Sequence, residues 1–329
     1  MLSKESSSQK TLICTHPRLM HFPIMMFAIV MGLSGLTLMY QKAALWLGFP
    51  SHIATILTTI DTLIFTIISL TYFIKLLLYP NSVKAEITHP VRLNFFAAFS
   101  ISLLLLASIY HEINLHVATV FWYFGAVFQT FFTFYTISFW FNQTMDIQHS
   151  NPAWFIPIVG NVIVPIGGFG IVDTAILLYF FCVGIFFWVI FLAIIINRII
   201  FHHQLAEKFL PTLFIFIAPP AIGMVSYVKI TAHFDLFANF LYNIGLFFTL
   251  LLLFMGKNFT KLKFFISWWA FTFPLAAMSI ASLLAYHHTK SPAYAYISYG
   301  LIWITTSIVM LVGVQTVRYI RKKEICIVE

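Results

Sequence analysis

The chain has 329 residues, of which 61% are hydrophobic and only 9% are charged, with a formal net charge of +8. Its mean hydropathy is +0.94. These values exclude an ordinary water-soluble protein, in which about 25% of the residues are charged. The apolar runs do not alternate with polar residues as the strands of a transmembrane β-barrel do. We therefore expect an all-α integral membrane protein.

Ten apolar runs are long enough to cross a bilayer, which takes about 20 apolar residues per helix. In chain order we expect spans at residues 22–41, 53–78, 91–110, 117–141, 154–172, 173–199, 211–229, 233–254, 264–286 and 293–318. Residues 1–21 and 319–329 are then tails on either side of a membrane domain at 22–318. No cleavage pattern precedes the first run, so we expect it to stay in the mature protein.

The distribution of Lys and Arg predicts the orientation of these spans. With the N-terminus inside the cell, fifteen of the eighteen Lys and Arg fall on the cytoplasmic side, and only Lys42, Lys229 and Lys290 fall outside. This bias is the positive-inside signature. It predicts a multi-pass protein of the cell (inner) membrane with both termini in the cytoplasm. Because the charge marks topology, we expect the lipid bilayer as a partner and no nucleic acid.

Prolines divide the spans into two classes. In the odd-numbered spans, Pro23 and Pro90 lie at the entrances and Pro157, Pro165, Pro219, Pro220 and Pro274 lie inside, whereas the even-numbered spans contain none in their interiors. A proline inside a helix removes a backbone hydrogen bond and kinks the helix, and the freed carbonyl must be sheltered from lipid. We therefore expect kinks at the last five of these prolines, with the odd spans inside and the even spans outside.

Regular spacing of the odd spans suggests five helical hairpins in series. Five such hairpins would close into a quasi-fivefold ring around a central pore. Small residues of the odd spans are candidates for the pore lining, namely Gly32, Gly160, Gly223 and Ala277. In the ninth span, Pro274 would turn Phe273 toward the axis, although Phe273 is also one of 38 phenylalanines that can simply pack a core.

Little in the spans points to catalysis or metal binding. Asp61 is the clearest acid within a span, and an intramembrane acid is a functional candidate. It is a candidate coupling acid, or a carboxyl bonded to hydroxyls such as those of Thr58 or Thr59. No metalloprotease or hydrolase motif is present. We therefore expect no enzyme activity and no cofactor.

Histidines and cysteines give no metal site either. The adjacent pairs His202–His203 and His287–His288 point in different directions on a helix, so we expect no metal there. The three cysteines are widely separated, and we expect neither a disulfide nor a thiolate site at Cys14, Cys182 or Cys326.

Fixed charge is absent from the middle of the odd spans. All five arginines lie in tails or at cytoplasmic helix ends, at positions 18, 92, 198, 318 and 321. A selective dicarboxylate carrier would be expected to hold an arginine at mid-membrane. A neutral interior with basic mouths suits weak binding and rapid passage, and it favours anions.

Four ordered blocks of sequence resemble one known family. They are VKAEITHPVRLNFFAAF at 83–99, NPAWFIPIVGN at 151–161, FIAPPAIGMVSY at 216–227 and SWWAFTFPLAAMSIAS at 267–282. The chain resembles the TehA tellurite-resistance and dicarboxylate-transporter family, which includes the slow-type anion channels of plant guard cells. It departs from the family pattern in its paired Pro219 and Pro220 and in Pro165.

The resemblance implies ten helices in five hairpins around one pore per subunit, usually in a homotrimer. It also implies that Phe273 closes the pore. The leading hypothesis is a passive channel for small inorganic anions such as chloride or nitrate. The alternative is a secondary transporter for C4-dicarboxylates such as malate, or an efflux protein for tellurite or drugs. A structural scaffold without a central path is a third reading.

Overall fold

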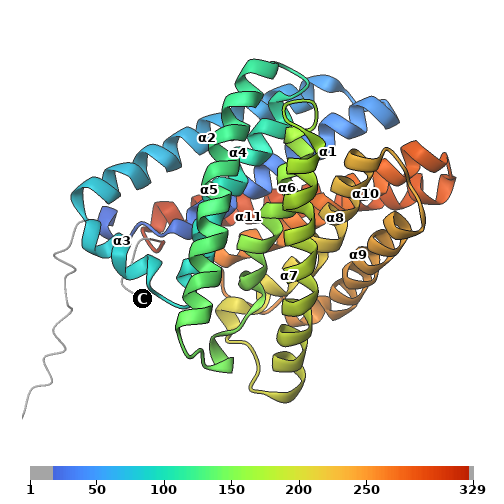
Figure 1. Cartoon of the computed structure of the whole chain (residues 1–329). Helices are drawn as coiled ribbons and strands as arrows, with labels where there is room; N and C mark the ends of the chain where they lie inside the picture. Colours follow the sequence, from blue (N-terminus) through green and yellow to red (C-terminus); the bar gives the residue numbers. More distant parts are fainter. Residues whose placement is uncertain (1–17, 326–329) are drawn as a thin grey trace, which may run out of the picture.

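The computed structural model describes residues 18–325, and within this range the chain is helical apart from turns and an isolated bridge between Phe169 and Val172 (Figure 1). The expectations for Cys14 and Cys326 fall outside the described residues. Nine described helices are long and apolar enough to cross a membrane, and the helix at Pro152–Gly168 is apolar but shorter. An all-helical fold built from apolar helices is thereby confirmed.

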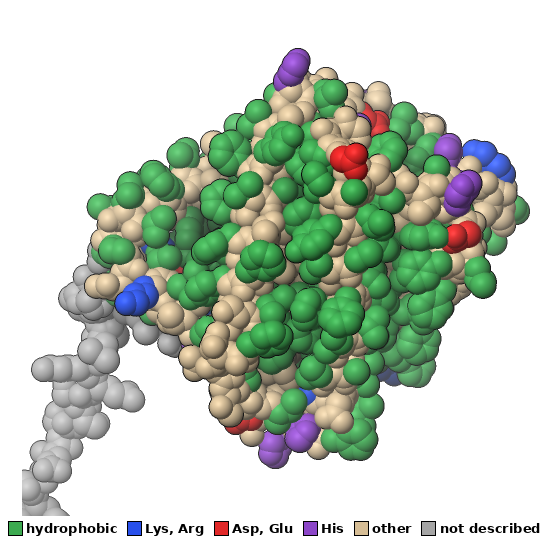
Figure 2. Space-filling view, viewed as in Figure 1, with side chains coloured by type: hydrophobic (Ala, Val, Ile, Leu, Met, Phe, Trp, Pro, Cys, Tyr) green, Lys and Arg blue, Asp and Glu red, His purple; other side chains and the backbone are tan. Residues whose placement is uncertain are grey.

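Five long helices have most of their surface exposed. In an apolar stretch of 18 residues of each helix, only 28–39% is buried within the chain. Figure 2 shows hydrophobic side chains spread across the middle of the visible surface, with charged and His side chains toward its ends. In water such a surface would be unstable, whereas in a bilayer it faces lipid. These helices are α2 Ser51–Leu78, α5 Leu115–Asn142, α7 Thr174–Phe201, α9 Leu236–Phe254 and α11 Pro292–Lys322.

The other five apolar helices are largely buried, and each begins as a 3-10 helix and continues as an α-helix. In the four that are at least 18 residues long, 72–89% of an apolar stretch of 18 residues is buried. The pairs are η2 Ile24–Met26 with α1 Phe27–Leu47, η3 Arg92–Phe96 with α4 Ala97–Tyr110, η5 Pro152–Phe155 with α6 Ile156–Gly168, η6 Glu207–Ile217 with α8 Ala218–Thr231, and η8 Ile266–Phe271 with α10 Thr272–Thr289. We call α1, α4, α6, α8 and α10, with these 3-10 segments, the inner helices.

Four of the five prolines expected to kink their helices lie close to these changes of helix type. Pro157 lies in the first turn of α6, Pro219 and Pro220 lie in the first turn of α8, and Pro274 is the third residue of α10. A proline in the first turn costs no hydrogen bond, because its missing N–H would have had no partner within the α-helix. Kinks at these four prolines remain a prediction, and what lies next to each of them is a change from 3-10 to α geometry. Pro165 alone of the five lies inside its helix.

The inner helices contact one another in a closed order. α1 packs against α4, α4 against α6, α6 against α8, α8 against α10, and α10 against α1. Each inner helix also packs against the exposed helix that follows it in the chain. Since the five inner helices are odd-numbered in the order of spans, they run in the same direction, and their 3-10 segments gather at the same end.

Buried polar side chains join α5 to the inner helices and α2 to α3 Pro80–Ile87. Gln129 of α5 donates to the carbonyl of Pro157 at 2.7 Å and accepts from the hydroxyl of Ser100 in α4 at 2.7 Å. Lys75 of α2 donates to Glu86 and to the carbonyl of Phe22, both at 2.8 Å. Glu86 lies in α3, a short helix that the sequence analysis did not predict.

Candidate functional site

An apolar cavity lies between the inner helices, close to the junctions of their 3-10 and α segments. All of its lining residues come from the five inner helices, and none comes from another described helix. Its volume is about 40 Å³, enough for only a few water molecules. The lining residues are Met25, Ala28, Met31, Phe95, Ala98, Ile101, Ile156, Val159, Thr212, Ile215, Ala218, Ser267, Trp269, Ala270, Phe273 and Pro274.

No ionisable side chain belongs to this lining, and its polar side chains are already hydrogen-bonded within the described part of the chain. The Thr212 hydroxyl donates to the Phe209 carbonyl and the Ser267 hydroxyl to the Lys208 carbonyl, both at 2.6 Å. The indole N–H of Trp269 donates to Thr316 at 2.9 Å. The cavity therefore presents a nearly pure hydrocarbon wall.

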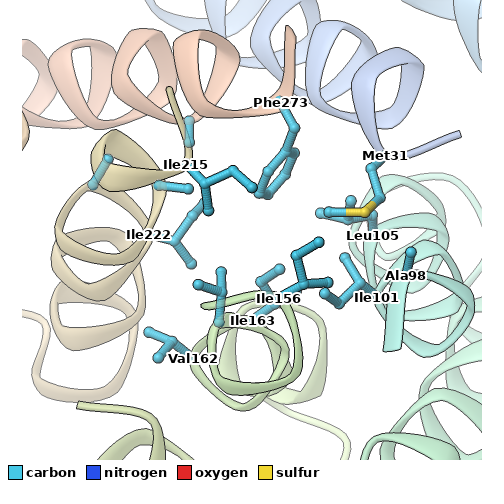
Figure 3. Packing of buried hydrophobic residues seen from close by; sticks show 14 of the residues in the cluster. Met31, Ala98, Ile101, Leu105, Ile156, Val162, Ile163, Ile215, Ile222 and Phe273 are labelled. Carbon is cyan, nitrogen blue, oxygen red and sulfur yellow. The ribbon is translucent and has the colours of Figure 1, made fainter. Parts of the chain in front are cut away.

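Phe273 is one of three aromatic residues that line the cavity, together with Phe95 and Trp269. Its side chain extends from α10 into the space between the inner helices, toward side chains such as Ile215 and Met31 (Figure 3). Only 4% of Phe273 is exposed. Gly35 of α1 lies behind it, and a Cβ added at Gly35 would be 3.2 Å from Cδ2 of Phe273. The close approach of α1 and α10 at this glycine thus helps to set the position of the ring.

The four small residues predicted to line the pore do not line the described cavity, and the three glycines among them lie at contacts between helices. A Cβ on Gly32 would overlap Thr272 of α10, and one on Gly160 would overlap Gln129 of α5. Gly223 faces Ile185 of α7 at 3.1 Å, measured from an added Cβ. Ala277 is fully buried, and none of the four belongs to the lining of the described cavity. Small residues here let helices approach closely, as they do at helix contacts in membranes generally.

A comparison with known families shows to which family this chain belongs. Residues 21–317 match the family model of the SLAC1 voltage-dependent anion channels. The chain belongs to this family. The resemblance drawn from the four sequence blocks is confirmed.

Relatives within the SLAC1 family differ in how much is known of them. The S-type anion channel SLAH2 of Arabidopsis thaliana is 31% identical over 82% of this chain and 53% of its own length, so the chain spans about half of that plant protein. An uncharacterized transporter of Methanocaldococcus jannaschii is 27% identical over 91% of the chain and 95% of its own length. The TehA tellurite resistance homolog of Haemophilus influenzae is 25% identical over 79% and 80%.

Asp61 lies away from the cavity in this SLAC1-family chain. It is completely buried between α2 and α1, where Oδ2 accepts a hydrogen bond of 2.6 Å from the Ser34 hydroxyl. Its Oδ1 atom has no hydrogen-bond donor among the described residues. The predicted alternative, a bond to Thr58 or Thr59, was wrong, because these hydroxyls donate to the carbonyls of Ala54 and Thr55 in their own helix.

Most of the cavity wall was not predicted from the sequence. Met31, Ile101, Ile156 and Ile215 resemble many other apolar residues of the chain, and nothing in their spacing sets them apart. The usable signal was the proline that marks the first α-helical turn in three of the five inner helices. Wall residues lie within a few positions of that turn, as Ile156, Ala218 and Phe273 do.

Proposed function

We propose that the protein is a passive channel for small monovalent anions such as chloride or nitrate. The path runs along the axis enclosed by the inner helices, which form a quasi-fivefold ring, and the Phe273 side chain closes it. The membrane domain at 22–318 sits in the cell membrane with both tails in the cytoplasm. The subunits form a trimer, as the resemblance to the TehA family implies.

The composition of the cavity wall is the observation that carries this proposal. Five helices in closed contact order each contribute residues to one cavity, and no other described helix contributes any. A shared axial cavity is what a ring of helices around a conduit requires. The few water molecules that fit beside Phe273 do not make a continuous wet path, which supports a closed state.

The chemistry of the wall supports conduction in preference to tight binding. Fast passage requires that an ion bind weakly enough to leave again. A wall without ionisable groups, and with its hydroxyls already bonded, offers no strong ligand to an ion or a substrate. A narrow hydrophobic constriction also gates by excluding water. Cation pathways usually carry rings of acids, and this wall has none among its described residues.

Reversal potentials test the proposal directly. The purified full-length protein is placed in planar bilayers with a tenfold KCl gradient. The current is measured in wild type and in Phe273→Ala, the variant expected to conduct more. The expected reversal potential lies near the chloride equilibrium potential. A reversal near the potassium equilibrium potential, or saturable flux that requires a proton gradient, would contradict a passive anion channel.

A secondary carrier is the second candidate, and Asp61 is the observation that favours it. Buried acids within transmembrane helices often serve as proton relays in transporters, and Oδ1 of Asp61 has no donor among the described residues. In a carrier for C4-dicarboxylates, Asp61→Asn should abolish malate uptake driven by a proton gradient. In the channel that we propose, the same substitution leaves chloride flux within about twofold of wild type, because Asp61 lies outside the cavity wall.

A further inference from the structure

A cluster of charged and aromatic side chains lies at the opposite end of the inner helices from the 3-10 segments. Lys42 is in the last turns of α1, Lys229 is in the last turn of α8, and Glu112 follows the end of α4. Lys42 and Glu112 are 70 positions apart, yet Nζ of Lys42 lies 2.5 Å from Oε1 of Glu112. These residues include two of the three lysines that the positive-inside count places outside the cell.

Contacts around these three residues involve the ends of all five inner helices. The His111 ring, which follows α4, is 2.9 Å from the carbonyl of Phe169, which follows α6. Nζ of Lys229 lies 5.3 Å from the centre of the Phe169 ring. Nζ of Lys42 lies 5.6 Å from the centre of the Trp46 ring.

Trp46, near the end of α1, stacks on His287 of α10 with ring centres 4.8 Å apart, so the end of α10 lies beside the end of α1. The five inner helices thus bring their last residues to one mouth. We call Lys42, Lys229 and Glu112 the mouth cluster.

The direction of the inner helices makes this mouth unfavourable for anions unless positively charged side chains lie beside it. Five parallel helices point their C-termini at it, and each C-terminus carries roughly half a negative charge. An anion that enters or leaves along the axis would meet this repulsion. Lys42 and Lys229 stand where they oppose it, and no other described Lys or Arg lies in the last two turns of α1, α4, α6 or α8.

Glu112 interacts with both lysines. Partial burial raises the pKa of the Glu112 carboxyl, but the hydrogen bond and charge of Lys42, with Lys229 and His111, outweigh it and hold that pKa below its ordinary value of 4.5. The carboxylate is therefore ionised at neutral pH. The side chains of Lys42 and Glu112 are 23% and 44% exposed, and an ion pair so open to water is weak. A dissolved anion can therefore compete with this carboxylate.

We propose that Lys42 and Lys229 form a binding site for small monovalent anions at this mouth, and that the carboxylate of Glu112 is a tethered competitor that occupies the site when no anion is bound. The inference rests on the proposed function, since this mouth is one end of the proposed path. Glu112 then sets how much free anion is needed to load the mouth.

Iodide quenching of Trp46 tests the site without requiring conduction. Iodide quenches indole fluorescence at short range, and the Trp46 ring lies beside Lys42. Full-length protein in detergent is titrated with sodium iodide at constant ionic strength, with gluconate as the replacement anion. The part of the signal lost in Trp46→Phe is the signal from the mouth.

The proposal predicts saturable quenching that shifts with the charge of the cluster. Glu112→Gln should lower the iodide concentration at half-maximal quenching by roughly fivefold, the effect of about one unit charge at contact distance in water. Lys42→Gln and Lys229→Gln should each raise it by a similar factor. Lys84→Gln, which removes a positive charge from α3 beside η3 at the opposite end of the inner helices, should leave it within about twofold.

Several outcomes would overturn the inference, and they are separable from failure of the proposed function. Quenching that stays linear with iodide concentration in wild type and in Glu112→Gln would show that no such site exists. The same follows if the half-maximal iodide concentration is unchanged in both Glu112→Gln and Lys229→Gln, measured on folded protein. If Lys42→Gln does not fold, these two variants still decide. Saturable quenching with the predicted shifts, in a protein that carries no anion current, would contradict the channel and leave the site standing.

Discussion

At the scale of single residues, the inner helices depend on glycines where side chains of neighbouring helices press against the backbone. A Cβ at Gly160 would overlap the amide of Gln129, which bonds both Pro157 and Ser100. The amide has to move to make room, and its two buried hydrogen bonds are then strained. We expect Gly160→Ala to destabilise the protein by about 1–3 kcal/mol.

The midpoint of thermal unfolding in detergent checks this expectation. Gly313→Ala is the matched control, because an added Cβ at Gly313 of α11 would meet no atom within 4 Å among the described residues. The control should unfold at or slightly above the temperature of wild type, since alanine favours helix. Equal midpoints for Gly160→Ala and wild type would show that Gln129 does not hold α5 to the inner helices.

The Lys42–Glu112 pair gives a prediction with a defined dependence on pH. Because the pKa of Glu112 is lowered in the folded protein, the pair contributes stability above the ordinary value of 4.5 and loses it as the pH falls through the lower folded value. A double-mutant cycle of Lys42→Gln and Glu112→Gln should give a coupling of about 0.2–1 kcal/mol at pH 7, as for exposed pairs. The coupling should persist at pH 5 and fade below pH 4.5. A coupling that vanishes already between pH 7 and pH 5 would contradict this assignment.

At the scale of helices, α3 is held to the body of the protein by a buried ion pair. The side chains of Lys75 and Glu86 are 1% and 7% exposed, and the Tyr72 hydroxyl also donates to Glu86 at 2.8 Å. Glu86→Ala leaves the Lys75 ammonium buried without its counter-ion, which costs about 3–5 kcal/mol. A large drop in the thermal midpoint is expected. Glu207→Ala, at the exposed start of η6, should have little effect, and equal losses in the two variants would refute a special role for the pair.

The helices themselves were largely predictable, but their internal structure was not. The ten apolar runs lie within a few residues of the described helices, because the length and apolar character of a span are set by the bilayer. Pro219 and Pro274 were predicted to kink the seventh and ninth spans, and in the structure they lie in the first turns of α8 and α10, next to the 3-10 segments. The sequence could not distinguish a kink from a change between 3-10 and α geometry, since a proline is compatible with both.

Contacts between residues far apart in the sequence could not be predicted from the sequence. Ser34 and Asp61, or Lys42 and Glu112, meet only because particular faces of their helices turn toward each other. In a chain that is apolar all round, no amphipathic pattern reveals those faces. Glycines were interpreted as lining a pore for the same reason, although in the structure they serve contacts between helices.

At the scale of the whole molecule, one arrangement accounts for both ends of the proposed path. Parallel inner helices in closed contact order place apolar 3-10 junctions at one end and the mouth cluster at the other. The exposed helices shield this interior from lipid. In this arrangement the obstacle on the proposed path is the apolar constriction at Phe273, where charge is absent.

Chloride flux through Phe273→Ala is the measurement that tests this requirement most directly. Phe271→Ala is the matched control, because Phe271 is buried against Phe214 and Phe259 and does not line the cavity. In liposomes with equal amounts of folded protein, Phe273→Ala should raise chloride flux roughly tenfold or more over wild type, as a barrier lowered by about 1.4 kcal/mol would, while Phe271→Ala stays near wild type. Flux that is unchanged in Phe273→Ala, or raised equally in both variants, would contradict a pore closed by Phe273.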